Sequence, residues 1–395
     1  MVVLADGCNK NSVLEVPNGN DITIELDHSY IQFGSGIETK GTLINGYLNN
    51  SFAVLGYQYP GMWTAEYVFA EPNVFTTTPQ VVTFDEDTQL YTYSPIQAWT
   101  GNRYSFFAYY PYDNVNYPNI KLFDNGTIKK GVPYITYTHP TDGDPTKLVD
   151  LMTASFIDTK IGYDEDGNEI NYEVNLEMQH RMSAIDICAR NYYKDDEGNL
   201  LTIEITKLEF KPIVAYKKAK FYLDGVTEPI TLEEGETGNL IYTLVTSSNP
   251  RPAWARSTVD IEDNNQNDTD LRYITSSDEN TTILLIPQSS ELDGTLELSY
   301  KMKYDDDTYV KNEQGEVIEK HVSYNLIDSK RALAEGRRYY VEITFTSDAV
   351  TVNITAADEW EELENDVVME FVYYGYEIFK NNYICFGIDL FFSLC

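Results

Sequence analysis

Along much of the chain, hydrophobic and polar residues alternate one by one, as in a strand with one buried and one solvated face. The clearest stretches are 201–205, 296–304, 339–345 and 350–354. Helical periodicity is scarce, and we expect helical turns only at 332–338 and 356–364. The pattern therefore predicts an all-β protein whose short antiparallel strands form a sandwich or a barrel.

The alternation changes phase in one informative place. Side chains at even positions from Val174 to Met182 share one face, and the apolar positions from Ile185 to Ala189 are odd. A single extra residue in a strand produces such a shift. We therefore expect a bulge or kink near Ser183-Ala184.

Three polar loops have the composition of hairpin turns. Residues 164–168, 195–199 and 312–316 each place a glycine among acidic or amide residues, between two strand-like stretches. At about 100–200 residues per domain, the 395 residues suggest two domains. We place their boundary near 191–199, where a polar hairpin precedes a new strand.

Aromatic residues are abundant, with 32 Tyr and 17 Phe. They crowd one region in particular: Trp99, Tyr104, Phe106, Phe107, Tyr109, Tyr110 and Tyr112. Exposed rings there could stack on sugars. Because several occupy alternating strand positions, packing in the core and across strands is the favoured interpretation.

The charge balance narrows the choice of partners. Asp and Glu total 63 and Lys and Arg 28, which gives a formal net charge of −35. Such a field repels phosphate backbones and anionic lipid surfaces, so no nucleic-acid partner is expected. It also favours solubility.

No motif predicts a metal centre, a cofactor or an enzyme. Residues 164–168 begin like a calcium loop, but the glycine is misplaced and the closing glutamate is missing. The acidic stretch 262–270 is better explained as a solvated loop. The four His lie far apart, and His180, on an apolar strand face, is interpreted as a buried, hydrogen-bonded residue. Nucleophile-elbow and phosphate-loop motifs are missing as well, so we expect no catalysis.

The two ends of the chain differ from the rest. Residues 1–24 resemble the remnant of an export leader, and Cys8 is a candidate for lipidation, the alternative being an ordinary exposed cysteine. Residues 372–395 form a strongly apolar tail, either a strand that needs a partner or an appended sequence. Cys188, among apolar neighbours, is expected to be a buried small hydrophobe.

Three stretches together resemble the fimbrillin-like proteins of Bacteroidota, the Mfa-like group that includes type V pilus subunits. They are 31–40 with 52–57, 91–99 with 104–111, and 150–152 with 174–185; weaker similarity occurs at 284–288 and 336–340. The resemblance covers about residues 25–371. It implies two tandem transthyretin-like antiparallel β-sandwich domains, 25–193 and 194–371.

The resemblance also implies a function. Members are exported to the outer membrane as lipoproteins, and in polymerising members a trypsin-like protease cuts after an arginine near the first strand. An extended segment of another subunit then fills the groove left by that strand. The matching position here is Lys40, which an arginine-specific protease would refuse. The alternative interpretation of Lys40, equally favoured, is a solvated turn residue.

The predicted function is therefore that of a structural or adhesive fimbrial subunit at the cell surface, with other fimbrial subunits as partners and a lipid anchor in the outer membrane. The alternative is a non-polymerising surface lipoprotein or tip adhesin that binds host or bacterial glycans or proteins.

Overall fold

The fold is known from a computed structural model. It describes residues 31–33, 48, 51–59, 71–85, 90–99, 103–112, 116–123, 132–160, 162–163, 169–170, 173–174, 176–223, 230–232, 238–250, 272–275 and 281–356. These residues fall within a compact unit, Met1–Glu362; a second unit, Leu363–Cys395, lies outside them. The described part contains strands and two short 3-10 helices, η1 (Pro145–Lys147) and η3 (Leu326–Ser329). The all-β prediction is confirmed.

The N-terminal strands form an eight-stranded sheet and a four-stranded sheet. The larger runs in the order β11 (Glu173–Val174), β1 (Gln32–Phe33), β4 (Leu90–Thr92), β3 (Gln80–Asp85), β2 (Phe52–Tyr59), β5 (Arg103–Tyr110), β8 (Met152–Lys160) and β12 (Gln179–His180). The smaller runs in the order β16 (Ile230–Leu232), β15 (Lys218–Tyr222), β7 (Tyr134–Thr138) and β6 (Ile120–Leu122).

Both faces of the central strands β2 and β5 are buried. Leu55 and Phe107 lie on one face and pack with Ile135 and Phe221 of the smaller sheet. The opposite face carries Phe106 and packs against the side chains of β1, β3 and β4. Seven of the eight residues of β5 are therefore buried, although strict alternation would expose half of them.

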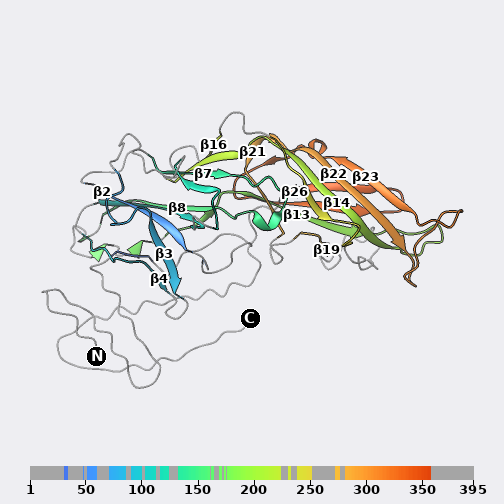
Figure 1. The fold of residues 1–395 in the computed structure, drawn as a ribbon, viewed down its shortest axis with the longest axis horizontal. Coiled ribbons are helices and arrows are strands. Elements are labelled where there is room, and N and C mark those ends of the chain that lie inside the picture. The colour runs from blue at the N-terminus through green and yellow to red at the C-terminus, as the bar shows by residue number, and fades with distance from the viewer. Residues whose placement is uncertain are drawn as a thin grey trace, which may run out of the picture. The chain divides into compact units, whose positions relative to one another are not determined.

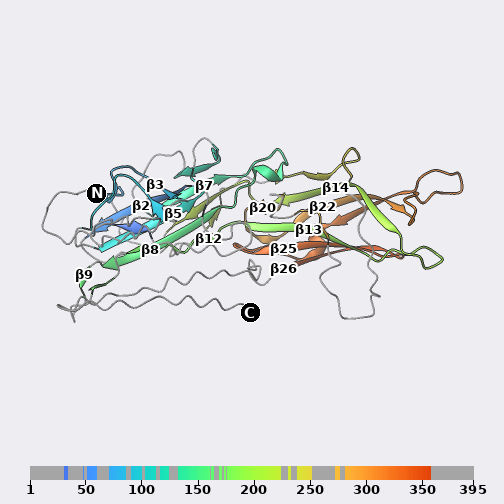
Figure 2. The ribbon, with the colours of Figure 1, turned by 90° about the horizontal axis from the view of Figure 1, so that it is seen from below.

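The C-terminal strands form a second sandwich (Figures 1 and 2). One sheet contains β19 (Arg272–Tyr273), β13 (Ser183–Asn191), β25 (Arg338–Phe345) and β26 (Val350–Ala356), with β20 (Ile283–Leu285) beside β13. The other contains β17 (Gly238–Asn239), β14 (Thr202–Val214), β22 (Asp293–Lys303) and β23 (Glu319–Asn325), with β18 (Tyr242–Val245) beside β14. Inward-facing side chains of β13, β14, β22 and β25 form one hydrophobic core. Two short ladders complete the set, β9 (Gly162–Tyr163) with β10 (Glu169–Ile170) and β21 (Gln288–Glu291) with β24 (Ala332–Leu333).

The predicted change of phase marks a passage between sheets. Strand β12 pairs with β8, and after Arg181 and Met182 the chain enters β13, which pairs with β25. The Arg181 backbone donates to the carbonyl of Leu151, and its guanidinium pairs with Glu335. These contacts hold the chain at the point where it changes sheet.

Strand pairing crosses the expected boundary at 193 in both directions. Strand β13 precedes this position and pairs with β25, which follows it. Strand β15 follows it and pairs with β7, which precedes it. The division into domains 25–193 and 194–371 stays a prediction.

Two of the three predicted hairpins lie in the described part, and both are present. Lys194 bridges Leu200 around the loop 195–199, and Lys311 bridges Val317 around 312–316. The prediction of a helix at 332–338 is wrong. Strand β24 opens this segment, the amide of Ala334 donates to the Tyr339 hydroxyl, and that of Gly336 donates to the carbonyl of Met182. A tyrosine hydroxyl and a carbonyl distant in sequence thus take the backbone donors that a helical turn would use.

A buried ion pair ties β13 to β25. Asp186 is fully buried, and its Oδ2 accepts hydrogen bonds from Nε of Arg338 at 2.7 Å and Nη2 at 2.5 Å. Its Oδ1 accepts a further bond from the Thr282 hydroxyl at 2.6 Å. Removing one member of such a pair leaves an uncompensated charge and typically costs about 3–5 kcal/mol.

Candidate functional site

Strand β1 (Gln32–Phe33) is a short segment that lies between two other strands. Strand β1 pairs antiparallel with β4, where Phe33 lies opposite Tyr91, and parallel with β11. Its N-terminal neighbour Ile31 donates its amide to the carbonyl of Gln97 at 2.8 Å. The backbone of 31–33 is therefore held on both sides by segments distant in sequence.

The side chains of this segment enter a deep aromatic pocket, here called the β1 seat: Phe52, Phe75, Tyr91, Tyr93 and Phe106, around Ile31 and Phe33. Ile31 is 1% exposed and Phe33 4%. The Phe33 ring meets those of Tyr93 at 5.5 Å, Phe52 at 6.1 Å and Phe106 at 6.2 Å, all edge to face. Aromatic pairs of this geometry contribute about 0.5–1.5 kcal/mol each beyond area burial.

Tyr93 connects this aromatic packing to the backbone. Its hydroxyl donates to the carbonyl of Ile31 at 2.9 Å and accepts a hydrogen bond from the Gln97 amide at 3.2 Å. Burial raises the pKa of Tyr93, and the bond from Gln97 acts in the opposite direction. The phenol therefore stays protonated and keeps its donor at neutral pH.

The β1 seat holds the protein's own residues 31–33 as an extended chain. Its two buried occupants lie two residues apart, the period of a strand, and the backbone between them is paired on both edges. Backbone pairing of this kind supplies affinity, and pockets for alternate side chains set the register. Any strand with large apolar residues at this spacing meets the same chemistry.

The aromatic cluster predicted as core is core. Tyr104, Phe106, Phe107, Tyr109 and Tyr110 are all buried, and Trp99 packs edge to face on Tyr104 at 4.8 Å. Of the seven residues, only Trp99 and Tyr112 are partly exposed. The interpretation as an exposed sugar platform therefore fails for the buried rings.

The histidines occupy separate structural positions. Nδ1 of His180 lies 2.8 Å from Asp150 Oδ1, as expected for a buried, hydrogen-bonded residue. His139 faces the carbonyls of Pro140 and Leu284, and His321 pairs with Ser299. Within the described residues, no group of three His, Cys, Asp or Glu is placed to hold a metal ion.

Several predicted features lie outside the described residues, namely the leader segment 1–24 with Cys8, His28, Lys40, the loops 164–168 and 262–270, the helical turn expected at 356–364 beyond its first residue, and the tail 372–395. Cys188 is described and is buried, as predicted, and burial raises the pKa of its thiol to about 12. Such a thiol stays protonated and unreactive at neutral pH.

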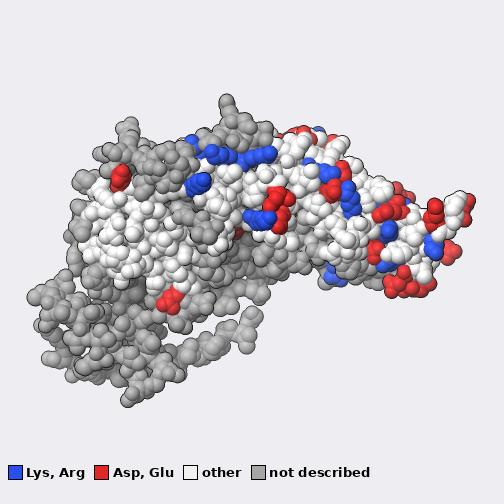
Figure 3. All heavy atoms as spheres, in the orientation of Figure 1, with Lys and Arg blue, Asp and Glu red and all other residues white. Residues whose placement is uncertain are grey.

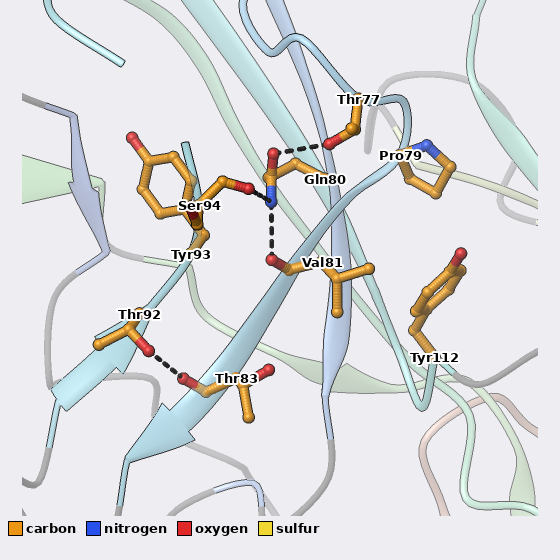
Figure 4. Close-up of a pocket in the computed structure, with 9 residues that line it drawn as sticks. All are labelled: Thr77, Pro79, Gln80, Val81, Thr83, Thr92, Tyr93, Ser94 and Tyr112. Carbon is orange, nitrogen blue, oxygen red and sulfur yellow. Dashed lines mark hydrogen bonds between the residues drawn. The ribbon is translucent and has the colours of Figure 1, made fainter. Parts of the chain in front are cut away.

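Two features of the structure could not be predicted from sequence motifs. The roles of Tyr93 and Gln97 in holding Ile31 were hidden, although both lie in the stretch 91–99 that carries the family resemblance. An open hollow beside β3 and β4, shown in Figure 4, was also missed because its lining residues are scattered from 77 to 112.

No helix in the described residues has the length and apolar character needed to cross a membrane. The sequence profile of a family described as fimbrillin-like matches residues 49–360. Among curated proteins, no relative matches the sequence.

Two solved structures illustrate the similarity. A fimbrial protein from Bacteroides vulgatus aligns with a TM-score of 0.55 at 17% identity, over 84% of this chain and 99% of that one. The fimbrial anchor protein Mfa2 from Porphyromonas gingivalis aligns with a TM-score of 0.30 at 10% identity, over 83% and 95% of the two chains. The first shows the shared fold; the second score is too low to support an argument.

Proposed function

Because this chain belongs to the fimbrillin-like family, we propose that it is a structural or adhesive subunit of a fimbrium that assembles by protease-triggered strand exchange. Membership in this family supports a fimbrial role at the cell surface. The further steps proposed below concern how it assembles and how it is anchored.

The β1 seat is the observation that carries this proposal. A two-residue strand has few backbone hydrogen bonds, yet Ile31 and Phe33 occupy the centre of an aromatic pocket. Loss of the segment would expose that pocket and the paired edges of β4 and β11. Exposed edges and apolar surface together favour the addition of another strand.

Cleavage after Lys40 would free the segment that contains β1. The Lys40 side chain carries the charge that a trypsin-like protease needs, and its departure from arginine predicts a lysine-tolerant enzyme. A donor strand of another subunit then occupies the seat. The apolar tail 372–395 is one candidate donor.

Export and anchoring complete the proposal. The leader remnant 1–24 ends its apolar stretch close to Cys8, and a lipid on that cysteine would hold the protein at the outer membrane. A single acyl chain gives only marginal membrane binding, so stable anchoring requires more than one chain. The two sandwich cores fit the proposed tandem transthyretin-like domains.

Limited digestion of the full chain with a lysine-specific protease tests the mechanism. The new N-terminus is identified by mass spectrometry, and the same sample is examined for SDS-resistant ladders. We expect cleavage after Lys40 followed by ladders, and neither in Lys40→Gln. A chain cut at Lys40 that stays monomeric would overturn strand exchange.

One observation favours a second function, ligand binding by a surface lipoprotein or tip adhesin. In the hollow beside β3 and β4, the strand residues Val81, Thr83 and Thr92 alternate with the inward-facing Val82 and Tyr91, and Tyr93 borders both the hollow and the β1 seat. A subunit could carry this hollow whether or not it polymerises.

A further inference from the structure

An open hollow of about 690 Å³ lies beside the outer face of β3 and β4. Figure 4 shows the Tyr112 ring and Pro79 on one side of Val81, and Thr83 and Thr92 on the other. Thr83 and Thr92 are direct partners across the two strands, and both are exposed. Small-molecule sites commonly measure about 300–1,000 Å³, so the hollow has room for a ligand of a few rings.

The floor of the hollow is fixed by Gln80, which is 3% exposed. Its Oε1 accepts a hydrogen bond from the Thr77 hydroxyl at 2.8 Å, and its Nε2 donates to the carbonyl of Val81 at 2.9 Å. The same nitrogen lies 3.4 Å from the carbonyl of Ser94. The buried Gln80 amide thus links the start of β3 to the chain after β4. The hydroxyls of Thr83 and Thr92 are carried by paired strands.

The lining selects against charged ligands. None of the nine lining residues that the structure describes is Lys, Arg, His, Asp or Glu, although the chain as a whole has a formal net charge of −35. In Figure 3 the described surface around β3 and β4 is mostly uncharged, with one red acidic group near the end of these strands, whereas red and blue groups gather over the far ends of β14 and β22. A phosphate, a sulfate or a metal ion would find no counter-charge here.

The pairing of β3 and β4 with their neighbours disfavours a peptide that would bind by adding a strand. Strand β3 is paired with both β2 and β4, and β4 is paired with both β3 and β1. In the described residues, β3 is paired with β2 over 80–82 and with β4 over 83–85, which limits the backbone left to pair with an added strand. The available groups are hydroxyls that both donate and accept, together with the apolar faces of Tyr112 and Pro79.

From these observations we infer that the hollow beside β3 and β4 binds a neutral saccharide. Its hydroxyl groups match the hydroxyl rim of a sugar ring, the Tyr112 and Pro79 faces match its apolar C–H face, and the open shape allows an oligosaccharide to extend beyond the site. This inference deepens the second function above and does not depend on strand exchange.

The test measures binding of the full chain to an immobilised panel of neutral hexose and N-acetylhexosamine oligosaccharides. Sialylated and sulfated counterparts are printed beside them. Tyr112→Ala removes the stacking face, and Thr83→Glu places a carboxylate in the hollow. Tyr112→Phe keeps the ring, and Thr351→Glu changes an equally exposed threonine on β26, outside the hollow.

We expect binding to at least one neutral oligosaccharide, weakened roughly tenfold or more by Tyr112→Ala and by Thr83→Glu. Tyr112→Phe and Thr351→Glu should bind as the unchanged protein does. Equal binding by all variants, binding to sialylated or sulfated probes alone, or no binding to any probe would each overturn the inference. Thermal unfolding of every variant verifies that it is folded.

Lys40→Gln separates this result from the assembly mechanism. We expect that variant to bind the same saccharide, because the hollow needs no cleavage. Ladders without saccharide binding would refute only the present inference, and saccharide binding without ladders would refute only strand exchange.

Discussion

At the scale of single residues, burial decides what a titratable group can do in this protein. His139 is 2% exposed, and its ring nitrogens face the carbonyls of Pro140 and Leu284 at 2.7 and 2.9 Å. Its Nε2 lies 3.4 Å from the Tyr242 hydroxyl. Burial lowers the pKa of His139, although the two carbonyls favour the charged ring.

This balance predicts a loss of stability in mild acid. Because the folded state lowers the pKa, the unfolded chain binds the proton more readily below about pH 6.5. The free energy of unfolding should therefore fall as the pH drops through that value, as measured by urea denaturation at pH 7.5 and pH 5.0. Carboxylates titrate in the same experiment, so the comparison needs a variant without the imidazole.

His139→Gln supplies that comparison. We expect it to be less stable than the unchanged protein at pH 7.5 by about 1–2 kcal/mol, since buried hydrogen bonds are weakened. The difference should shrink at pH 5.0, because glutamine does not titrate. A difference that is constant or grows in acid would contradict the lowered pKa.

The alternation in the sequence identified which residues are buried but not which residues they contact. It placed Tyr104 and Phe106 in a core correctly. It could not indicate that His139 contacts Leu284, 145 positions away, or that Gln97 holds Ile31. Such partners depend on sheet order, which local patterns do not encode.

At the scale of elements, long strands were predictable and short ones were not. In runs such as 296–304, hydrophobic and polar residues alternate because one face of the strand contacts solvent. This run corresponds to β22. Two-residue strands such as β1 and β24 are too short to show any period. The helix expected at 332–338 failed for this reason, because tertiary contacts override a weak local signal.

A glycine in β22 should be essential to its pairing with β14. Gly294 lies opposite Pro212 at φ 114°, and an added Cβ would stand 2.1 Å from the carbonyl oxygen of Lys211. Backbone cannot yield there, so we expect Gly294→Ala to destabilise the protein by several kcal/mol, on the order of 3 or more. Gly315→Ala is the control: its φ is 82°, but nothing lies near the new Cβ.

Denaturant unfolding of the two variants distinguishes the cost of the steric clash at position 294 from the cost of placing alanine at a positive φ. Gly315→Ala should cost only about 1–2 kcal/mol, the usual penalty for the left-handed region. Similar losses in both variants would show that the close approach at Gly294 relaxes easily.

The β1 seat predicts a specific effect of Phe33→Ala. The substitution removes a buried ring and should lower stability by about 3–5 kcal/mol. After cleavage at Lys40, we expect the fragment 1–40 to dissociate faster than in the unchanged protein. Size-exclusion chromatography of the cleaved protein over time measures this release.

Phe221→Ala is the matched control, because Phe221 is 0% exposed and belongs to a different core cluster. It should destabilise the protein by a similar amount without hastening release of the fragment. Equal release rates in both variants would mean that general destabilisation, and not the seat, controls β1.

At the scale of the whole molecule, charge opposes assembly. Two subunits of formal net charge −35 repel each other, and screening weakens that repulsion. The Debye length falls from roughly 30 Å at 0.01 M salt to about 8 Å at 0.15 M. We therefore expect protein already cleaved at Lys40 to form ladders faster at the higher salt concentration.

Cleavage before the change of salt keeps protease activity out of the comparison, and densitometry of SDS gels gives the rate. A rate that falls with salt would indicate that attraction between opposite charges guides the subunits together. The net charge, known from composition alone, predicts that salt accelerates assembly. The place where subunits would meet, the β1 seat, could be identified only from the fold.

The parallel ladder between β13 and β25 has a consequence for the order of folding. Its ion pair joins Asp186 to Arg338 across 152 positions. The fully buried strand β13 is therefore synthesised long before its partner strand β25. At about 5–20 residues per second, synthesis leaves that strand without its partner for roughly 8–30 s. The nascent chain therefore exposes this strand during that time, and the C-terminal sandwich cannot close until nearly the whole described chain has emerged.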